Sequence, residues 1–321
     1  MIAPCRHHRG WSRSCAQRSS AERRIEGPAA PRRQRFSAIV PHTLGERRVS
    51  AAGKISRVPG ILGPMSPRPP IVLSIGGHDP SGGAGIQADI EAIVAQGAWV
   101  QTAITALTIQ DSCGLRRTMP VPARDLGEQI ALLLADARIP VLKVGMVADL
   151  DQVEVIAGAI GDRLLIWDPV LAPSRGRTFM DDTLRSALLR ELLPRTTLIT
   201  PNSPEARRLT GHEDLDDCAA ALQALGCRNV LVTGGHEPGA RIRHRLYLAD
   251  GARRESTWPR LPGEYHGSGC TLAAAIAARM ALGEGVGEAV DGALAYTWQA
   301  LQRARRLGRC QYSPDRLHAW R

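Results

Sequence analysis

Short hydrophobic runs alternate with stretches of helical periodicity along most of this chain. From Ile71 onward, runs rich in Ile, Val and Leu have the length and composition of buried strands. Between these runs, apolar residues recur every three to four positions, as at Ile86, Ile90 and Ile93, and such spacing predicts amphipathic helices. The pattern predicts strands at 71–75, 100–110, 141–144, 164–168, 197–200 and 230–233, a hairpin of 245–248 with 254–258, and helices at 86–96, 129–137, 151–160, 183–193, 204–210 and 287–306, with one more directly after Gly269.

This alternation of strands and helices indicates the class of fold. Parallel strands need long crossover connections, and the predicted helices between successive strands provide them. No internal repeat is apparent. We therefore predict an α/β protein, a three-layer α/β/α sandwich with a mostly parallel central sheet, over residues 65–321.

The first 64 residues differ from the rest in composition. They contain 13 of the chain's 41 Lys+Arg and 3 of its 31 Asp+Glu, so they carry the whole net charge of +10. Because residues 1–64 are also rich in Arg and Pro and lack an apolar period, we expect them to be disordered. Three interpretations remain open: a transit peptide, a nucleic-acid-binding arm, or translated sequence upstream of a true start at Met65. We favour the last, because a strand begins soon after Met65. The balanced charge of 65–321 argues against a nucleic-acid surface there.

Cysteine usage and hydropathy bear on the compartment. The chain has seven cysteines, and no two of them form a Cys-x-x-Cys pair or a Cys/His cluster with zinc-ligand spacing. No apolar run resembles a secretory signal or is long enough to span a membrane. We therefore expect a cytoplasmic protein with free thiols and no membrane partner.

The stretch 265–275 carries the strongest chemical signal. Gly267 and Gly269 let the backbone turn tightly before an Ala-rich helix, whose first N–H groups and partial positive charge can hold an anion. Cys270 lies at this helix end, which should favour its thiolate. The stretch thus predicts an anion site beside a base. The alternative is an ordinary loop in which Ser268 is the helix N-cap and Cys270 packs in the first turn.

Other polar residues lie at predicted strand ends, where ligands collect in open parallel sheets. Gln110 and Asp168 each end an apolar strand. Asp89 belongs to the helix after the glycine-rich loop 76–85, which is neither a Walker loop nor a clean dinucleotide fingerprint. For Gln110 and for Asp89 two interpretations stay open: each binds a ligand, or each is an ordinary solvated residue.

Two further residues allow both a functional and an ordinary interpretation. Helix 204–210 has Ser203 as its predicted N-cap and Gly211 just past its end. Glu205, in its first turn, would either compensate the helix dipole or hold a magnesium ion through water. Met146 would either contact a ligand or fill the core.

Five blocks of sequence occur in an order that resembles a known family. Hydroxymethylpyrimidine/phosphomethylpyrimidine kinases of thiamine biosynthesis, which belong to the ribokinase-like superfamily, carry similar blocks in the same order. The resemblance covers the chain from Pro70 to Leu307, and its first and last blocks are each specific. The blocks are GHDPSGGAGIQAD at 77–89, TALTIQ at 105–110, KVGM at 143–146, TPNSPEA at 200–206 and HGSGCTL at 266–272.

The resemblance implies a kinase that uses ATP and Mg²⁺. Its substrate would be 4-amino-5-hydroxymethyl-2-methylpyrimidine, and the monophosphate of that compound would be a second substrate. Gln110 would hydrogen-bond the aminopyrimidine. Gly77, Asp89, Met146 and Val170 would line the same pocket.

The resemblance also implies a nucleotide side of the site. Asn202 and Glu205 match the superfamily's Asn-x-x-Glu motif near magnesium and phosphate, and Asp168 would join Glu205 in holding Mg²⁺ through water. Thr233 and Gly235 would lie beside the nucleotide. Many members carry lysine where this chain has Thr233, so no lysine contact to phosphate is implied there.

The last block would supply the catalytic groups. Gly267, Ser268 and Gly269 match the anion hole, and Cys270 stands where sugar kinases of the superfamily have an aspartate base. A thiolate there could accept the proton of the substrate hydroxymethyl group while helix N–H groups meet the charge on the phosphoryl group.

Three rival interpretations are weighed against this one. Pyridoxal/pyridoxine kinase is the alternative within the enzymes, because related kinases accept both hydroxymethyl heterocycles. A nucleic-acid-binding protein would use the Arg-rich arm, and a non-catalytic kinase fold would lack the acidic and thiol groups present here. The family resemblance also suits a homodimer.

Overall fold

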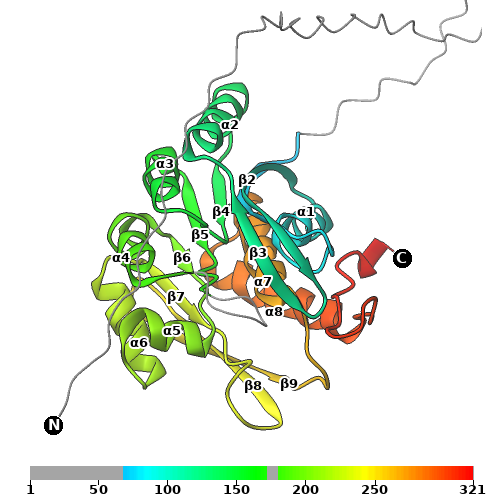
Figure 1. The fold of residues 1–321 in the computed structure, drawn as a ribbon. Coiled ribbons are helices and arrows are strands. Elements are labelled where there is room, and N and C mark those ends of the chain that lie inside the picture. Colours follow the sequence, from blue (N-terminus) through cyan, green and yellow to red (C-terminus); the bar gives the residue numbers. More distant parts are fainter. Residues whose placement is uncertain (1–67, 172–179, 321) are drawn as a thin grey trace, which may run out of the picture. The chain divides into compact units, whose positions relative to one another are not determined.

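A nine-stranded sheet forms the centre of the structure (Figure 1). The computed structural model describes residues 68–171 and 180–320, and the strand count refers to that part of the chain. The strands are β1 (Ile71–His78), β2 (Trp99–Asp111), β3 (Gly114–Pro120), β4 (Val141–Val144), β5 (Leu164–Trp167), β6 (Leu198–Ile199), β7 (Asn229–Val232), β8 (Arg241–Tyr247) and β9 (Arg253–Pro259). Their order is β3-β2-β1-β4-β5-β6-β7-β8-β9. The neighbouring strands β2, β1, β4, β5, β6 and β7 pair in parallel. The edge strand β3 pairs antiparallel with β2, β8 pairs antiparallel with β7, and β9 pairs antiparallel with β8.

Helices cover both faces of this sheet (Figure 1). One face carries α2 (Ala123–Asp136), α3 (Leu150–Ile160), α4 (Asp182–Glu191), α5 (Ser203–Thr210) and α6 (Leu215–Ala224), and the other carries α1 (Gly85–Ala95), α7 (Ser268–Ala281) and α8 (Val286–Gln302). Short 3₁₀ turns lie at Leu193–Arg195 and His318–Trp320. None of the helices within 68–171 and 180–320 is both long and apolar enough to cross a membrane.

The two faces bury separate hydrophobic clusters. Successive side chains of a strand point to opposite faces, so Leu73 of β1 packs beneath α2 to α6 while its neighbour Val72 packs beneath α1, α7 and α8. Leu142 and Val141 of β4 divide in the same way. The near-continuous apolar strands of the sequence are thus explained by burial on both faces, and the predicted α/β/α sandwich is confirmed.

Several element boundaries differ from the prediction. Helix α2 begins at Ala123, six residues before the predicted 129–137. Strand β3 and helix α6 were not predicted. Much of β3 is exposed at the sheet edge, so it lacks the apolar run that identifies a buried strand.

The start of α5 corrects the predicted cap. Asn202, and not Ser203, is the N-cap: its side-chain oxygen accepts the Glu205 N–H at 2.9 Å. The Glu205 carboxylate accepts the Asn202 N–H at 2.9 Å in return, which completes a capping box. Asparagine caps as well as serine does, and the glutamate three residues later decides between the two.

The predicted disordered segment 1–64 and the possible start at Met65 lie outside the described residues. All of the described residues fall within one structural unit.

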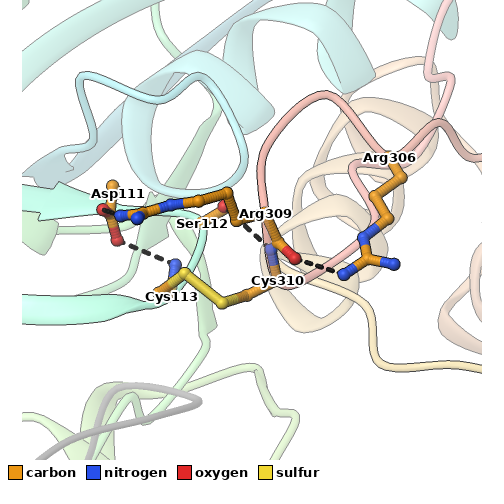
Figure 2. Close-up of a disulfide and its surroundings, with 6 residues drawn as sticks. All are labelled: Asp111, Ser112, Cys113, Arg306, Arg309 and Cys310. Atoms are coloured by element: carbon orange, nitrogen blue, oxygen red, sulfur yellow. Dashed lines mark hydrogen bonds and ion pairs between the residues drawn. A yellow bond between two sulfur atoms is a disulfide. The ribbon is translucent and has the colours of Figure 1, made fainter.

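A disulfide corrects the expectation that the cysteines are free. Cys113, in the β2–β3 turn, is bonded to Cys310 in the segment after α8, with 5.0 Å between their Cα atoms (Figure 2). The Ser112 hydroxyl accepts the Cys310 N–H, and Arg309 lies 3.7 Å from Asp111. The partners are 197 residues apart, so their spacing in the sequence gave no sign of the pairing.

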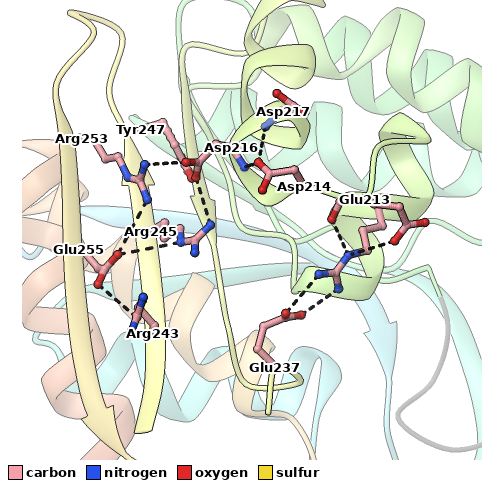
Figure 3. A network of polar contacts seen from close by, with 11 residues as sticks. Glu213, Asp214, Asp216, Asp217, Glu237, Arg243, Arg245, Tyr247, Arg253 and Glu255 are labelled. Carbon is pink, nitrogen blue, oxygen red and sulfur yellow. Dashed lines mark hydrogen bonds and ion pairs between the residues drawn. The ribbon is translucent and has the colours of Figure 1, made fainter. Parts of the chain in front are cut away.

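A polar network fastens the β8–β9 hairpin to α6 (Figure 3). Asp216 of α6 accepts hydrogen bonds from Arg245 at 3.1 Å, from Arg253 at 2.7 Å and from the Tyr247 hydroxyl. Nearby, Arg207 of α5 binds both carboxylate oxygens of Glu237, at 2.8 and 3.2 Å. These contacts hold the hairpin beside the carboxyl end of β7.

The strand order creates a crevice at the carboxyl ends of the parallel strands. From β1 the chain first adds β2 on one side and later β4 on the other. Loops that leave adjacent strands in opposite directions open a gap at the carboxyl ends, where open α/β sheets bind ligands. The loops after β1 and β4 border this gap.

Candidate active site

A cavity of about 490 Å³ opens at the carboxyl ends of the parallel strands. The structure brings all the ligand-binding and catalytic candidates from the sequence around it, although they come from eight different segments. What each of them binds stays a prediction. The residues are Gly77, Asp89, Gln110, Met146, Asp168, Val170, Asn202, Glu205, Thr233, Gly235, Gly267, Ser268, Gly269 and Cys270.

The first turn of α7 forms one wall. Gly267 is its N-cap, with a φ of 75° in the left-handed region, and no side chain caps the helix. A Cβ at Gly267 would lie 2.0 Å from the Gly83 carbonyl oxygen, so only glycine allows the two loops to approach. The Thr271 N–H donates to the Gly267 carbonyl at 3.0 Å. The amides of the three residues before Thr271 precede that bond and have no intrahelical acceptor, which leaves them for an anion.

The Cys270 thiol is partly exposed to the cavity but largely shielded from bulk water. Burial raises the pKa of Cys270 to about 12, and the charges of Asp168 and Asp89 act in the same direction. The Lys143 ammonium and the Gly85 N–H, which donates to the sulfur, oppose this shift. The prediction that this thiol ionises readily is therefore wrong, because desolvation and two carboxylates outweigh the helix end.

The charge of a buried lysine acts on the thiol. The Lys143 ammonium is 3.0 Å from both oxygens of Asp89 and 3.9 Å from Oδ2 of Asp168. Burial alone would lower the pKa of Lys143, but Asp89, Cys270 and Asp168 together raise it above its ordinary value. Asp89 also accepts the Ser74 hydroxyl at 2.6 Å. Its carboxylate is thus engaged with Lys143 and Ser74.

Two of the carboxyl groups that line the cavity, those of Asp168 and Glu205, have raised pKa values. Burial raises the pKa of Glu205 to about 8, and the charge of Asp168 adds to the shift. Burial likewise raises the pKa of Asp168, against the attraction of Lys143. Asp168 accepts a hydrogen bond from the Cys270 thiol, while its Oδ2 is buried without a hydrogen-bond partner.

These carboxylates have the chemistry of a magnesium site. Among the described residues there is no group of three or more His, Cys, Asp or Glu side chains that could enclose a metal. Mg²⁺ in phosphate-transfer sites is usually held by one or two carboxylates together with substrate phosphates and water. Asp168, with its unpartnered oxygen, and Glu205 fit that description.

A hydrogen-bonded aspartate shapes the glycine-rich loop, and the sequence reasoning gave it no role. The buried Asp79 carboxylate accepts the N–H groups of Ser81 at 2.9 Å and Ala84 at 2.8 Å and contacts His266 Nε2 at 2.8 Å. Burial would raise the pKa of Asp79, but the hydrogen bonds from His266 and Ser81 hold it below its ordinary value. Both Asp79 and His266 belong to the two specific sequence blocks, which was the available signal.

The far end of the cavity is apolar and aromatic. Ile242 and His244 of β8, Trp258 of β9, and Trp298 and Leu301 of α8 line it. Burial lowers the pKa of His244 to about 4, so this imidazole is neutral at ordinary pH. The sequence identified the hairpin but gave no sign that one of its faces would line the site.

Comparison with known proteins decides the family. The family model described as phosphomethylpyrimidine kinase matches residues 79–315. The chain belongs to this family. A hydroxymethylpyrimidine/phosphomethylpyrimidine kinase of Salmonella typhimurium is 36% identical over 260 residues, which cover 77% of this chain and 97% of the relative. As a member of the phosphomethylpyrimidine kinase family, the chain is a kinase.

Solved structures of similar fold include two kinds of vitamin kinase. The ADP complex of Bacillus subtilis pyridoxal kinase has a TM-score of 0.72 and 27% identity, and the match covers 77% of this chain and 97% of that one. Phosphomethylpyrimidine kinase from Clostridium difficile has a TM-score of 0.63 and 30% identity, with coverage of 72% and 99%. The ribokinase-like fold predicted from the sequence is confirmed.

Proposed function

We propose that this kinase transfers the γ-phosphoryl group of ATP to the hydroxymethyl oxygen of 4-amino-5-hydroxymethyl-2-methylpyrimidine, and then phosphorylates the resulting monophosphate, in thiamine biosynthesis. The observation that carries the proposal is that the Gln110 amide, an uncapped helix N-terminus and two carboxyl groups all border one cavity of about 490 Å³. A relative from Geobacter sulfurreducens that is named a thiamine biosynthesis bifunctional protein is 36% identical over 248 residues, which cover 74% of this chain and 50% of the relative.

The pyrimidine would lie over the ends of β1, β2 and β4. Gln110 has both a donor and an acceptor on its amide, which matches a ring nitrogen beside an exocyclic amino group. A Cβ at Gly77 would lie 3.0 Å from the Met146 sulfur, so this glycine makes room for the methionine that covers the ring. Val170 adds an apolar wall. Asp89 would act through Lys143 and Ser74 on the floor of the pocket.

Phosphoryl transfer is mostly positioning and charge neutralisation. The amides of Ser268, Gly269 and Cys270 would bind the equatorial oxygens of the transferring group. A bound Mg²⁺, held by Asp168 and Glu205 through water, would neutralise charge on the phosphates and on these carboxylates. Asn202 fixes the Glu205 carboxylate through the capping box.

The Cys270 sulfur is the proposed acceptor of the hydroxymethyl proton. Lys143 and the Gly85 N–H favour the thiolate, whereas Asp168 and Asp89 disfavour it. Neutralising Asp168 therefore lowers the cost of taking up negative charge on the sulfur. At this raised pKa the sulfur is a protonated thiol, which cannot accept a proton. Neutralisation of Asp168 would lower the pKa and increase the fraction of Cys270 that is the thiolate base.

The nucleotide would extend from the anion hole towards β8 and β9. Thr233 and Gly235 lie at the end of β7, between the Asn202 capping box and the hairpin. Beyond them, the indole rings of Trp258 and Trp298, whose centroids lie 5.7 Å apart, line the cavity and would contact a purine base.

We also propose a cytoplasmic homodimer. Leu107, Ile109 and Met119 on β2 and β3 are 44, 40 and 37% exposed at one edge of the sheet, and Leu107 pairs with Met119 across the strands. A second copy would bury this apolar row. Sedimentation should give a dimer, and a Leu107→Glu variant should be monomeric; a monomeric wild type would contradict this part of the proposal.

An ATP-coupled assay tests the function. We expect kcat/KM on the hydroxymethylpyrimidine to exceed that on pyridoxal, because the Gln110 amide would be left unpaired by a ring without the amino group. Gln110→Leu should remove most of that preference. A higher kcat/KM on pyridoxal would assign the chain to the alternative activity.

A further inference from the structure

Arg316 is a buried cation close to the site, and it follows the last residue of the family match, which ends at 315. It is 2% exposed, and it lies in the segment after α8, which returns to the glycine-rich loop. A charged side chain is rarely buried unless its donors are satisfied. We infer that Arg316 is a positioning residue that holds the glycine-rich loop and the first turn of α7 together around Cys270.

The first half of this clamp acts on the glycine-rich loop. The Arg316 guanidinium donates to the carbonyl of Gly82 at 3.2 Å and to that of Gly83. These bonds fix the two peptide planes that lead to Ala84 and Gly85. On the other side of the loop, the N–H groups of the same stretch donate to Asp79 and Ser81.

The second half acts on α7. Nε of Arg316 donates to the Thr271 hydroxyl at 2.8 Å, and that hydroxyl donates to the Gly267 carbonyl at 2.7 Å. Thr271 is fully buried and follows Cys270 directly. One planar guanidinium therefore contacts both chain segments that meet at the anion hole, and its fixed fork of donors sets their relative position.

The effect on the reaction would pass through two groups. The Gly85 N–H, two residues after Gly83, donates to the Cys270 sulfur. The N-terminal amides of α7 are oriented by the turn that Thr271 closes. Releasing either segment would move an N–H donor away from the sulfur or from the phosphoryl group.

Arg316 is itself held in place. The Arg316 guanidinium lies 3.0 Å from the Glu91 carboxylate of α1. The Tyr296 hydroxyl of α8 donates to the backbone carbonyl of Arg316 at 2.8 Å. Glu91 is partly exposed and belongs to α1 rather than to either site loop, so it balances the charge rather than orienting the site. The arginine is thus anchored from α1 and α8 while it contacts the site loops.

The test compares Arg316→Lys and Arg316→Met with Arg303→Met, which removes an exposed arginine at the end of α8. Displacements of about 1 Å at a reacting centre cost about 10²-fold in rate, so we expect kcat to fall by about 10–100-fold in both Arg316 variants. The dissociation constant of the pyrimidine should change little. Millimolar guanidinium should restore part of the kcat of an Arg316→Ala variant.

Hydrogen exchange gives a readout that does not depend on the substrate. The kcat test rests on the proposed function, so a second measurement that needs no substrate is required. Amide hydrogen exchange of the peptides that cover 79–91 and 266–275 is therefore measured by mass spectrometry in all variants. Exchange should accelerate in these two peptides and stay at the wild-type rate in the sheet. Should Arg316→Met fail to fold, Arg316→Lys and Thr271→Val carry the same test.

Three results decide the matter. Faster exchange in both loops with reduced kcat supports the clamp. Two results overturn the inference: wild-type rates of hydrogen exchange in both loops, or a wild-type kcat although exchange in the loops is faster. A wild type that phosphorylates neither heterocycle refutes the proposed function, and the exchange data then still decide whether Arg316 orders the two loops.

Discussion

Replacing Lys143 by methionine removes the ammonium group that lies between Asp89 and Asp168 in the floor of the site. At an effective dielectric constant of about 20, unit charges 3.0 Å apart attract by about 5.5 kcal/mol, and charges 3.9 Å apart by about 4 kcal/mol. The burial of the ammonium offsets part of this attraction. Loss of one partner of a buried ion pair usually costs about 3–5 kcal/mol, and we expect Lys143→Met to lower the free energy of unfolding by that amount.

The destabilisation should depend on pH in a defined direction. Lys143 has a pKa raised above its ordinary value, so its contribution is fully present below about pH 10. In the variant, the pKa of Asp168, which burial already raises, should rise further because the ammonium no longer opposes burial, and the folded state then takes up protons more readily than the unfolded state. The stability gap between wild type and variant should therefore be larger at about pH 8 than at about pH 5.

Urea unfolding at the two pH values measures this prediction. A Lys143→Met/Asp89→Asn double variant provides the matched control, because it removes the cation and one buried anion together. It should be more stable than Lys143→Met alone. A loss below about 1 kcal/mol, or a loss of equal size at both pH values, would refute the charge balance derived for the floor of the site.

Three other perturbations follow from the geometry. Glu205→Gln should weaken Mg²⁺-dependent activity and abolish its rise with pH through about 8, the pKa of Glu205, because only the ionised carboxylate holds the cation; an unaltered Mg²⁺ titration would exclude this residue. Gly267→Ala should reduce kcat by about 10²-fold or more, because its Cβ would lie 2.0 Å from the Gly83 oxygen, whereas Gly285→Ala, in open space at the start of α8, should retain wild-type turnover. Cys113→Ser should lower the unfolding free energy by about 2–4 kcal/mol through loss of the disulfide, and equal urea midpoints for oxidised wild type and variant would contradict this.

The fold and the position of the site could largely be predicted from local sequence signals. Buried parallel strands are long apolar runs, and the residues that end them gather at one edge of the sheet, as Gln110 and Asp168 do. Glycines that permit close approach, such as Gly267, lie beside the chemistry they allow. These features need no knowledge of distant partners.

Features that depend on distant partners could not be predicted in this way. Lys143 meets Asp89 across 54 residues, and Cys113 meets Cys310 across 197. The pKa of Cys270 was misjudged for the same reason. The helix end is visible in the sequence, whereas the desolvation and the carboxylates that raise the pKa appear only once the sheet is assembled.

The proposed reaction requires the Cys270 sulfur to take the substrate proton at the start of α7. Its most direct test is the steady-state phosphorylation of the hydroxymethylpyrimidine by Cys270→Ala at saturating ATP and Mg²⁺, with Cys218→Ala, a buried cysteine of α6, as the control. We expect a kcat about 10²–10⁴-fold lower for Cys270→Ala, with an unchanged pyrimidine dissociation constant, and we expect Cys218→Ala to keep the wild-type kcat. A kcat within about threefold of wild type would contradict it.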